Sequence, residues 1–385
     1  MIKRTWNLLC FGGLLFLIYY ICISSTVMLG GGSDRVLRQS QPSDERIVRL
    51  DCSGVTGDKA DSCDEDGQQD RDSGLAPGDP GITPENPLFV LILSSLPRSG
   101  STMLSEALSS LPGSVLFFEP LWIQEKTSCI HDEDCVADFL MDAFRCTYGE
   151  SFEAWLRSKH LFFNFFHPDV RKCVRKGKGK NKECFSQIDV RALCRGAPVR
   201  LTKVIRSKLV FLEKYVRDAD NFKVIYLTRD PRGSLNSIAK FKTWNQDPHE
   251  RCEGLEDDLA AYEIFSEIYP SKVLHVKYED FCLHPENKTS EIMSFLTGNH
   301  TIPQELRDYL AEHMSKRRGN RNMSTFKDSR KEFQAWRSKI PEDLLKKVES
   351  EPACASSVLK MGHRLFKSVR VARNFNISLF MGSHL

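Results

Sequence analysis

Two short polar segments of the chain carry the residue types that bind phosphate groups. The first reads PRSGST and spans residues 97–102. Its guanidinium and hydroxyl groups can donate hydrogen bonds to anionic oxygens. The candidate anion-binding residues are Arg98, Ser99, Gly100, Ser101 and Thr102. The segment is not a standard nucleotide-binding loop, because that motif ends in Gly-Lys-Ser/Thr. An ordinary polar turn is the alternative interpretation.

The second polar segment reads TRDPRGSLNS and spans residues 228–237. Ser237 follows Arg229 by about two helical turns, so both side chains can lie on one face. One Arg and one Ser can together hold a phosphate. The alternative is a local ion pair between Arg229 and Asp230, with Ser237 on the surface. Together, the two segments predict a ligand that carries two separate phosphates.

Each polar segment follows an apolar run and precedes a helical pattern. Leu88–Leu93 is entirely apolar, and Phe222–Thr228 is a mainly apolar run before Arg229. Such short runs are typical of strands buried on both faces of a parallel sheet. The start of the next helix presents backbone N–H groups and the positive end of the helix dipole to an anion. The sequence therefore predicts strand, turn and helix at both segments.

Strand-like and helix-like stretches alternate through the rest of the chain. We expect further strands at Ser114–Phe118, Arg200–Ile205 and Val273–Tyr278. We expect helices at Lys208–Arg217, Gly254–Tyr269, His284–Leu296 and Pro303–Met314, and a packed core helix at the aromatic stretch Trp155–Phe166. This alternation predicts an α/β fold with a central, mostly parallel sheet flanked by helices. Ligands of such sheets bind at the carboxyl ends of the strands.

Glu119 and Lys203 stand at or near the ends of two predicted strands. A carboxylate in that position can act as a general base, or it can pair with Arg98 or cap a helix. Lys203 could add positive charge to the site, and a surface lysine is an equal alternative. No histidine has a spacing that indicates a catalytic role.

The N-terminal part of the chain has the pattern of a membrane anchor followed by a stem. Residues 8–29 are apolar over about the length that crosses a bilayer. Lys3 and Arg4 precede them, which places residues 1–7 in the cytosol. A cleaved signal peptide is the alternative. Residues 30–87 are rich in Gly, Ser, Asp and Pro and predict a disordered acidic stem. A lumenal domain at residues 88–370 and a tail at 371–385 should follow.

Cysteines and glycosylation sequons indicate a secretory compartment. The chain has 13 Cys, a number typical of proteins with disulfides in an oxidising environment. Two groups are close enough for local loops, one from Cys129 to Cys146 and one from Cys173 to Cys194. N-x-S/T sequons stand at Asn287, Asn299, Asn322 and Asn376. No CxxC pair or Cys/His cluster has zinc-ligand spacing, so we predict no metal.

Positive charge is concentrated in the part of the chain after the stem. The whole chain has a net charge of +3, while the stem is acidic, so the predicted domain is basic. A basic domain favours an anionic ligand, although an excess this small is also common. The run at residues 171–182, RKCVRKGKGKNK, is a solvated loop or a contact for a sulfated or carboxylated polysaccharide. Nucleic acid is not expected as a partner of a lumenal domain.

The combination of PRSGST, FEPLW at residues 118–122 and LTRDPRGSLNS resembles the membrane-bound carbohydrate sulfotransferases. The closest resemblance is to the branch that sulfates the 6-hydroxyl of galactose, N-acetylgalactosamine or N-acetylglucosamine. It implies a P-loop-like sulfotransferase fold, with 3′-phosphoadenosine 5′-phosphosulfate as the sulfate donor. In that family, the segment Arg98–Thr102 would hold the 5′-phosphosulfate, and Arg229 and Ser237 would hold the 3′-phosphate.

The resemblance extends to a C-terminal loop, Ser324–Ser329, that closes over the nucleotide in this family. Thr325 and Lys327 are the candidate nucleotide contacts there. The family commonly has Arg at the second position, and Lys keeps the charge but loses the bidentate donor geometry. Lys327 is therefore the least typical of the implied contacts.

These features imply a Golgi type II membrane enzyme that sulfates keratan, chondroitin or a glycoprotein glycan. Arg98 would stabilise charge on the leaving group and Glu119 would take the proton of the sugar hydroxyl. The expected partners are a glycan or proteoglycan acceptor and the membrane, and a homodimer is left open. A protein-tyrosine sulfotransferase and an inactive lumenal glycan-binding relative are the alternative functions.

Overall fold

The computed structural model describes residues 81–156, 164–176, 188–315, 325–326 and 328–382. The expected anchor at residues 8–29 and nearly all of the expected stem lie outside this part of the chain. Asn322 and Lys327 lie outside it too. Within the described residues, no helix combines the length and the apolar character that a membrane span requires.

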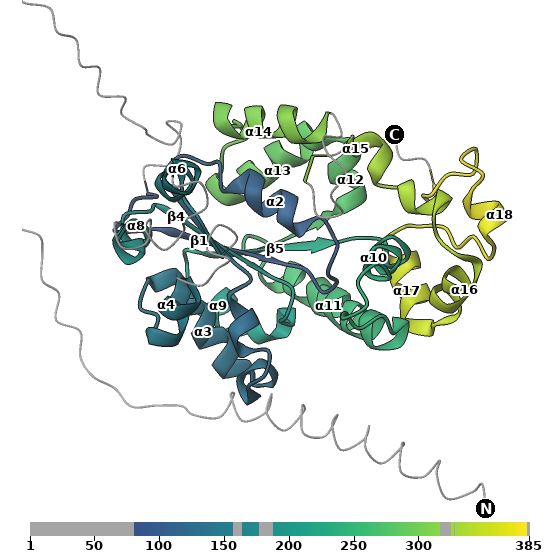
Figure 1. The fold of residues 1–385 in the computed structure, drawn as a ribbon, viewed down its shortest axis with the longest axis horizontal. Helices are drawn as coiled ribbons and strands as arrows, with labels where there is room; N and C mark the ends of the chain where they lie inside the picture. The colour runs from purple at the N-terminus through teal and green to yellow at the C-terminus, as the bar shows by residue number, and fades with distance from the viewer. Residues whose placement is uncertain (1–80, 157–163, 177–187, 316–324, 327, 383–385) are drawn as a thin grey trace, which may run out of the picture. The chain divides into compact units, whose positions relative to one another are not determined.

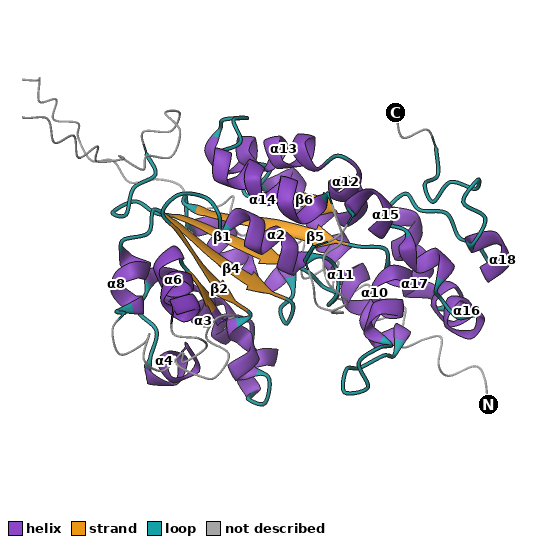
Figure 2. Ribbon diagram, turned by 45° about the horizontal axis from the view of Figure 1, so that its top comes forward, coloured by secondary structure: helices purple, strands orange, loops and turns teal. Residues whose placement is uncertain are grey.

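A six-stranded sheet forms the centre of the domain, in the order β3-β2-β4-β1-β5-β6 (Figure 2). The strands are β1 (Leu88–Leu93), β2 (Ser114–Phe118), β3 (Phe165–Phe166), β4 (Val199–Val204), β5 (Phe222–Thr228) and β6 (Val273–Lys277). Strand β1 lies between β4 and β5 and is parallel to both. Strands β2 and β6 continue the parallel pairing outward, and β3 is antiparallel to β2. The carboxyl ends of β2, β4, β1, β5 and β6 therefore share one edge.

Helices cover both faces of this sheet. In Figure 1, α2, α13 and α14 lie on one side of the strands, and α3, α4 and α9 on the other. The arrowhead of β5 points toward α10, with α16 and α17 beyond it. The α-helices are α2 (Ser101–Leu108), α3 (Glu133–Arg145), α4 (Glu150–Leu156), α6 (Pro168–Lys176), α8 (Val190–Arg195), α9 (Glu213–Asp218), α10 (Pro231–Ile238), α11 (Pro248–Ile268), α12 (Tyr278–Leu283), α13 (Pro285–Thr297), α14 (Gln304–Met314), α15 (Ser329–Glu332), α16 (Glu342–Ser350), α17 (Pro352–Lys360) and α18 (Val369–Ala372). The 3-10 helices are η1 (Pro120–Gln124), η2 (Ser128–His131), η3 (Leu209–Leu212) and η4 (Ala335–Ser338).

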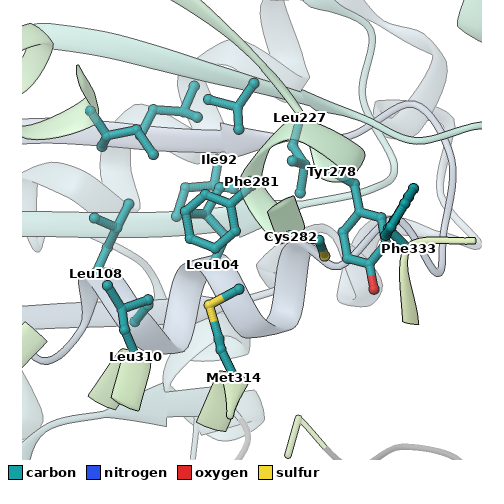
Figure 3. Packing of buried hydrophobic residues seen from close by; sticks show 14 of the residues in the cluster. Ile92, Leu104, Leu108, Leu227, Tyr278, Phe281, Cys282, Leu310, Met314 and Phe333 are labelled. Atoms are coloured by element: carbon teal, nitrogen blue, oxygen red, sulfur yellow. The ribbon is translucent and has the colours of Figure 1, made fainter. Parts of the chain in front are cut away.

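Alternate residues of β1 enter different parts of the core. Ile92 packs with Leu104 and Leu310 on the face covered by α2 and α14 (Figure 3). Leu91 packs on the opposite face, with residues of α3 and α11. This division follows from the two-residue period of a strand. Because every residue of β1 is buried, the strand has no polar position. Each of its large side chains contributes about 1.5–3 kcal/mol relative to exposure.

The predicted strands of the parallel sheet are confirmed, with boundaries that agree to within one residue. Ser114–Phe118 and Phe222–Thr228 match β2 and β5 in full. The helix expected at Lys208–Arg217 is divided into the 3-10 helix η3 and the α-helix α9. The central, mostly parallel sheet flanked by helices is therefore as predicted.

The expected core helix at Trp155–Phe166 is wrong at its C-terminal end, and residues 157–163 of that stretch lie outside the described part of the chain. Helix α4 ends at Leu156, and Phe165 and Phe166 form the short strand β3. The physical reason is cross-strand aromatic packing, which favours a strand for such residues. The Phe165 ring lies 5.2 Å from that of Phe117 in β2. The burial inferred from the aromatic pattern is correct, because Phe165 is only 1% exposed.

The described cysteines form disulfides that link distant as well as neighbouring parts of the chain. The bonds whose two cysteines are both described are Cys129–Cys135, Cys146–Cys194 and Cys252–Cys354, and Cys173 is disulfide-bonded as well. The first closes a local loop as the spacing suggested, whereas the second joins the two predicted groups. Cys282 is a buried free thiol.

Residues 371–382, which the sequence pattern assigns to a tail, pack onto the domain. The buried Arg337 donates hydrogen bonds to the carbonyl groups of Ala372 and Asn374 at 2.7 and 2.8 Å. Phe380 is also buried, at 8% exposure. The C-terminal segment is thus held by a guanidinium that satisfies backbone acceptors.

The sequons differ in exposure. Asn287, in α13, and Asn376 are exposed, while Asn299 is half-buried. Asn299 also accepts a hydrogen bond from the backbone N–H of Thr301 at 2.9 Å. Glycosylation at these positions stays a prediction.

Candidate active site

The turn between β1 and α2 has a backbone that only a few residues adopt. Arg98 and Gly100 have φ angles of 66° and 91°. Left-handed backbone is costly for residues other than Gly and is concentrated at functional sites. A Cβ on Gly100 would lie 2.4 Å from the Tyr278 ring, so this position also requires Gly for close packing. Ser99 is fully buried, and its Oγ has no hydrogen-bond partner among the described residues.

The side chain of Arg98 reaches from this turn to α10. Its Nε donates a hydrogen bond to Ser237 Oγ at 3.2 Å. Its guanidinium carbon lies 5.4 Å from the centroid of the Phe241 ring, a cation–π distance. Burial, and then the positive charge of Arg229, lower the pKa of Arg98. The turn therefore presents a cation held in a partly desolvated setting, where it acts more strongly on an anion than in water.

Arg229 lies at the carboxyl end of β5 and contacts the same turn. Its Nη1 donates to the backbone carbonyl of Arg98 at 2.8 Å. Its guanidinium lies over the Tyr278 ring, 4.4 Å from the centroid. The Nε of Arg229 is buried without a hydrogen-bond partner in the described structure. The two anion-binding segments predicted from sequence are thus in direct contact. Asp230 is not the local partner of Arg229 that the alternative interpretation required.

Asp230 instead pairs with Arg232 in the first turn of α10. Both side chains are fully buried, with Nη2 and Oδ2 separated by 2.7 Å. Arg232 also donates to Glu349 of α16 at 2.6 Å. Burial raises the pKa of Asp230, but the Arg232 charge outweighs it and holds this pKa far below its usual range. These buried ion pairs tie the C-terminal helices to the turn that carries Arg229.

Glu119 is the centre of a second charged cluster, at the end of β2. Its backbone is left-handed, with a φ of 55°. One carboxylate oxygen accepts a hydrogen bond from the buried Lys203, and the other accepts from Arg206 Nη1 at 2.5 Å. Burial raises the pKa of the Glu119 carboxyl, but the charges and hydrogen bonds of Lys203 and Arg206 together lower it. Glu119 is therefore an ion-paired carboxylate, with partners other than Arg98.

Lys203 is buried, not a surface residue. Its side chain is 3% exposed, and its ammonium lies 4.6 Å from the centroid of the Phe118 ring. Burial lowers the pKa of Lys203 while the Glu119 carboxylate opposes that shift. Of the two interpretations from sequence, the structure supports positive charge within the site.

Thr325 lies against the helix that begins at the first anion-binding turn. Its Oγ1 is 3.0 Å from His313 Nδ1 and 3.4 Å from Glu106 Oε2 of α2. The His313 ring stacks between the rings of Tyr309 and Phe326, at 3.9 and 3.8 Å. The start of the predicted closing loop is therefore docked beside α2. Lys327 falls outside the described residues, so its contact stays a prediction.

Some residues of the site were missed from sequence. Arg206 follows the end of β4, so the strand-end rule that selected Arg98 and Arg229 could have found it. Phe241 and Tyr278 approach the two arginines only through the packing of α10 and α12. No local sequence signal identifies them.

A parallel sheet with two contacting, cation-bearing turns at one edge defines an α/β protein suited to a phosphorylated ligand. The chain belongs to the sulfotransferase family, whose sequence model matches residues 87–301. That match includes both anion-binding segments and Glu119. It confirms the family resemblance predicted from sequence, and the chain is a sulfotransferase enzyme.

Several known proteins are similar to parts of this chain. Carbohydrate sulfotransferase 3 of Homo sapiens is 25% identical over 339 residues, which cover 75% of this chain and 70% of that protein. Carbohydrate sulfotransferase 1 of Danio rerio is 27% identical over 184 residues, 41% of this chain and 42% of that protein. Among solved structures, the sulfotransferase domain from the Synechococcus PCC 7002 olefin synthase aligns over 76% of this chain and 96% of that one, with 16% identity and a TM-score of 0.36.

Proposed function

We propose that the protein is a carbohydrate sulfotransferase that uses 3′-phosphoadenosine 5′-phosphosulfate as the donor. The acceptor is a sugar 6-hydroxyl in keratan, chondroitin or a glycoprotein glycan. The observation that carries the proposal is the contact of Arg98 with both Ser237 and Arg229 at one edge of the sheet. The relatives named carbohydrate sulfotransferase support a sugar as the acceptor.

The described residues fit a ligand with two phosphates. Ser99 Oγ and Arg229 Nε are buried donors without partners in the described chain. A buried donor left unpaired costs about 1–3 kcal/mol, and an anionic oxygen would remove that cost. We assign the 5′-phosphosulfate to Arg98, Ser99, Gly100, Ser101 and Thr102. We assign the 3′-phosphate to Arg229 and Ser237, with Thr325 and Lys327 closing over the nucleotide.

When bound, the donor supplies a sulfuryl group already activated by a phosphate leaving group. Transfer of such groups depends mainly on in-line positioning and on stabilisation of charge. Arg98 provides a positive charge whose position is fixed by Ser237 and Phe241. A preorganised cation of this kind needs little rearrangement as negative charge develops.

We assign the general base to Glu119. Its lowered pKa keeps the carboxylate ionised at neutral pH, so Oε1 or Oε2 can accept the proton of the sugar hydroxyl. Lys203 and Arg206 fix the orientation of the carboxylate. The same pairing weakens the base, because a lower pKa reduces its affinity for a proton. The arrangement therefore fixes the orientation of the Glu119 carboxylate but lowers its affinity for a proton.

We further propose a Golgi location, with residues 8–29 as the membrane anchor and the catalytic domain in the lumen. The disulfides at Cys129–Cys135, Cys146–Cys194 and Cys252–Cys354 support an oxidising compartment. A glycan or proteoglycan is then the natural partner in that compartment.

The test is transfer of radiolabelled sulfate to a panel of keratan, chondroitin and mucin-type glycans, followed by disaccharide analysis of the products. Label at a sugar 6-hydroxyl supports the proposal, and label on protein tyrosine would replace it with a tyrosine sulfotransferase. A parallel titration with adenosine 3′,5′-bisphosphate measures the nucleotide site directly. Absence of both binding and transfer would favour an inactive relative.

A further inference from the structure

Asp258 is a buried carboxylate of α11 that the proposed reaction does not use. It is 2% exposed. Within the described chain, no Lys or Arg nitrogen lies within 4.0 Å of its oxygens. A carboxylate buried without an ion-pair partner is expensive, so its hydrogen bonds should have a specific use. Each of its oxygens accepts one short hydrogen bond, and the two donors belong to segments that follow different strands.

The first donor is in the loop that leads to Arg98. Ser95 Oγ donates to Asp258 Oδ2 at 2.7 Å and lies 3.0 Å from the Tyr226 hydroxyl. A serine hydroxyl can donate one hydrogen bond, and Ser95 donates it to Asp258. The Tyr226 hydroxyl must therefore donate to Ser95. Tyr226 is fully buried in β5. A chain of hydrogen bonds thus runs from the central sheet through Ser95 to α11. Ser95 lies three residues before Arg98.

The second donor is the first residue of η3, directly after the loop that follows β4. The backbone N–H of Leu209 donates to Asp258 Oδ1 at 2.7 Å. This loop carries Arg206, which pairs with Glu119 at 2.5 Å and with Glu125 at 3.3 Å. Glu119 and Glu125 flank the 3-10 helix η1. The position of Leu209 therefore helps to set the position of Arg206, and through it the orientation of the proposed base.

We propose that Asp258 is a positioning residue that fixes the Arg98 loop and the Arg206 loop at a constant separation for sulfuryl transfer. This inference rests on the proposed function and deepens it. One carboxylate oxygen holds the loop that binds the donor, and the other holds the loop that orients Glu119. Because both oxygens belong to one rigid group on a long helix, the two loops cannot shift independently. A misplacement of about 1 Å between reacting groups can cost on the order of 100-fold in rate.

The test compares Asp258→Ala and Asp258→Asn in the full-length chain, with Asp257→Asn as the matched control. Asp257 is the adjacent residue of α11, is 55% exposed and pairs with Lys208 at 3.2 Å. Asp258→Ala should weaken adenosine 3′,5′-bisphosphate binding and lower kcat by about tenfold or more. Asp258→Asn should restore much of both, because its amide oxygen can accept from Leu209 and its NH2 can donate to Ser95. Asp257→Asn should behave as the wild type.

Ser95→Ala removes only one of the two hydrogen bonds that Asp258 accepts. It therefore still tests the inference if Asp258→Ala fails to fold. It removes the bond to the Arg98 loop and leaves the Leu209 bond, so it should weaken nucleotide binding more than it lowers kcat at saturating donor. The melting temperature of each variant is measured alongside, and active protein is counted by nucleotide titration.

The inference is overturned if Asp258→Ala binds the nucleotide and turns over as the wild type does. It is also overturned if the lost activity equals the lost fraction of folded protein, because Asp258 is then only structural. A wild-type chain that neither binds the nucleotide nor sulfates a glycan would overturn the proposed function itself, and this inference with it.

Discussion

The Nε of Arg98 lies 3.2 Å from the Oγ of Ser237, so the two segments assigned to opposite ends of a nucleotide touch each other. Arg229 strengthens the connection by donating to the Arg98 carbonyl at 2.8 Å. The two proposed phosphate sites therefore adjoin each other, and a substitution at one side chain should affect binding at both ends of the ligand.

Two replacements of Arg98 should distinguish the effect of its positive charge from that of its hydrogen-bond geometry. Arg98→Ala removes both and should lower kcat by about 100-fold or more, the usual loss for a donor that stabilises transition-state charge. Arg98→Lys keeps the charge but loses the planar fork whose Nε reaches Ser237, so an intermediate loss is expected. Steady-state rates with saturating donor and acceptor measure this. Full activity in Arg98→Ala, with normal nucleotide affinity, would exclude the assigned site.

Gly233→Ala should disturb Arg229 without replacing a charged residue. A Cβ at Gly233 would lie 2.9 Å from Trp336 Cδ1 and 3.1 Å from Arg229 Nε. Overpacking of this kind costs about 1–3 kcal/mol, and movement of Arg229 should weaken adenosine 3′,5′-bisphosphate binding. Calorimetry measures the nucleotide affinity of the variant, and thermal unfolding measures its stability.

Gly254→Ala is the matched control for this prediction. Gly254 lies inside α11, and a Cβ there would meet no atom within 4 Å. Ala in a helix interior is more stable than Gly by about 0.5–1 kcal/mol, so this variant should gain stability and keep its nucleotide affinity. Equal behaviour of the two variants would mean that the space beside Gly233 is not needed for Arg229.

The Glu119–Lys203 pair should affect stability and catalysis in different ways. Glu119→Gln leaves the buried Lys203 charge poorly compensated, and breaking a buried pair costs about 3–5 kcal/mol. The double variant Glu119→Gln with Lys203→Met removes both charges and should recover most of that stability. It should remain as inactive as Glu119→Gln, because the proposed base is absent. Recovery of activity in the double variant would show that Glu119 is only a structural partner of Lys203.

The ionisation of Glu119 should also appear in the pH dependence of the wild-type rate. Burial raises the pKa of Glu119, but ion pairing lowers it overall, so the base stays ionised to a lower pH than an ordinary carboxylate does. A depressed pKa also contributes stability that is present above the unfolded-state value and is lost as the pH falls through the folded-state value. The acid limb of kcat/KM should therefore lie below that of an ordinary carboxylate. An acid limb near pH 6 or above would assign the base to another group.

The sequence predicts the parallel sheet well because its strands are buried on both faces. Leu88–Leu93 has no solvent-facing position, and that leaves an unmistakable apolar run. The rule that ligands gather at strand ends then selects Arg98, Glu119 and Arg229 from local sequence. The same rule gives no information on β3, because two residues are too few to produce a periodic pattern.

The connections between these residues could not be predicted from sequence. The Arg98–Ser237 and Ser95–Asp258 contacts join residues 139 and 163 positions apart. Such contacts depend on how α10 and α11 pack on the sheet, and no local spacing encodes them. The pairing of Glu119 with Lys203 and Arg206 could not be predicted for the same reason, because these two residues come from a neighbouring strand and its following loop.

Asp258 should give the folded protein a characteristic dependence of stability on pH. Burial raises the pKa of this carboxyl to about 6, against an ordinary value of 3.8, while the bonds from Leu209 and Ser95 and the charge of Lys208 oppose the rise and Asp257 adds to it. Because the folded-state pKa is the higher one, this group contributes stability below pH 3.8 that is lost as the pH rises through about 6.

The free energy of unfolding of the wild type should therefore fall relative to that of Asp258→Asn as the pH rises from 4 to 7. A difference of about two pKa units corresponds to about 3 kcal/mol. Urea unfolding at several pH values measures it, with Asp257→Asn correcting for the loss of one carboxylate from α11. Curves for wild type and Asp258→Asn that stay parallel over this range would show that Asp258 does not bear the desolvation cost expected of a buried carboxylate. If the curves diverge while Asp258→Asn retains nucleotide binding, the hydrogen bonds of Asp258 position the two loops, and its negative charge is dispensable for that role.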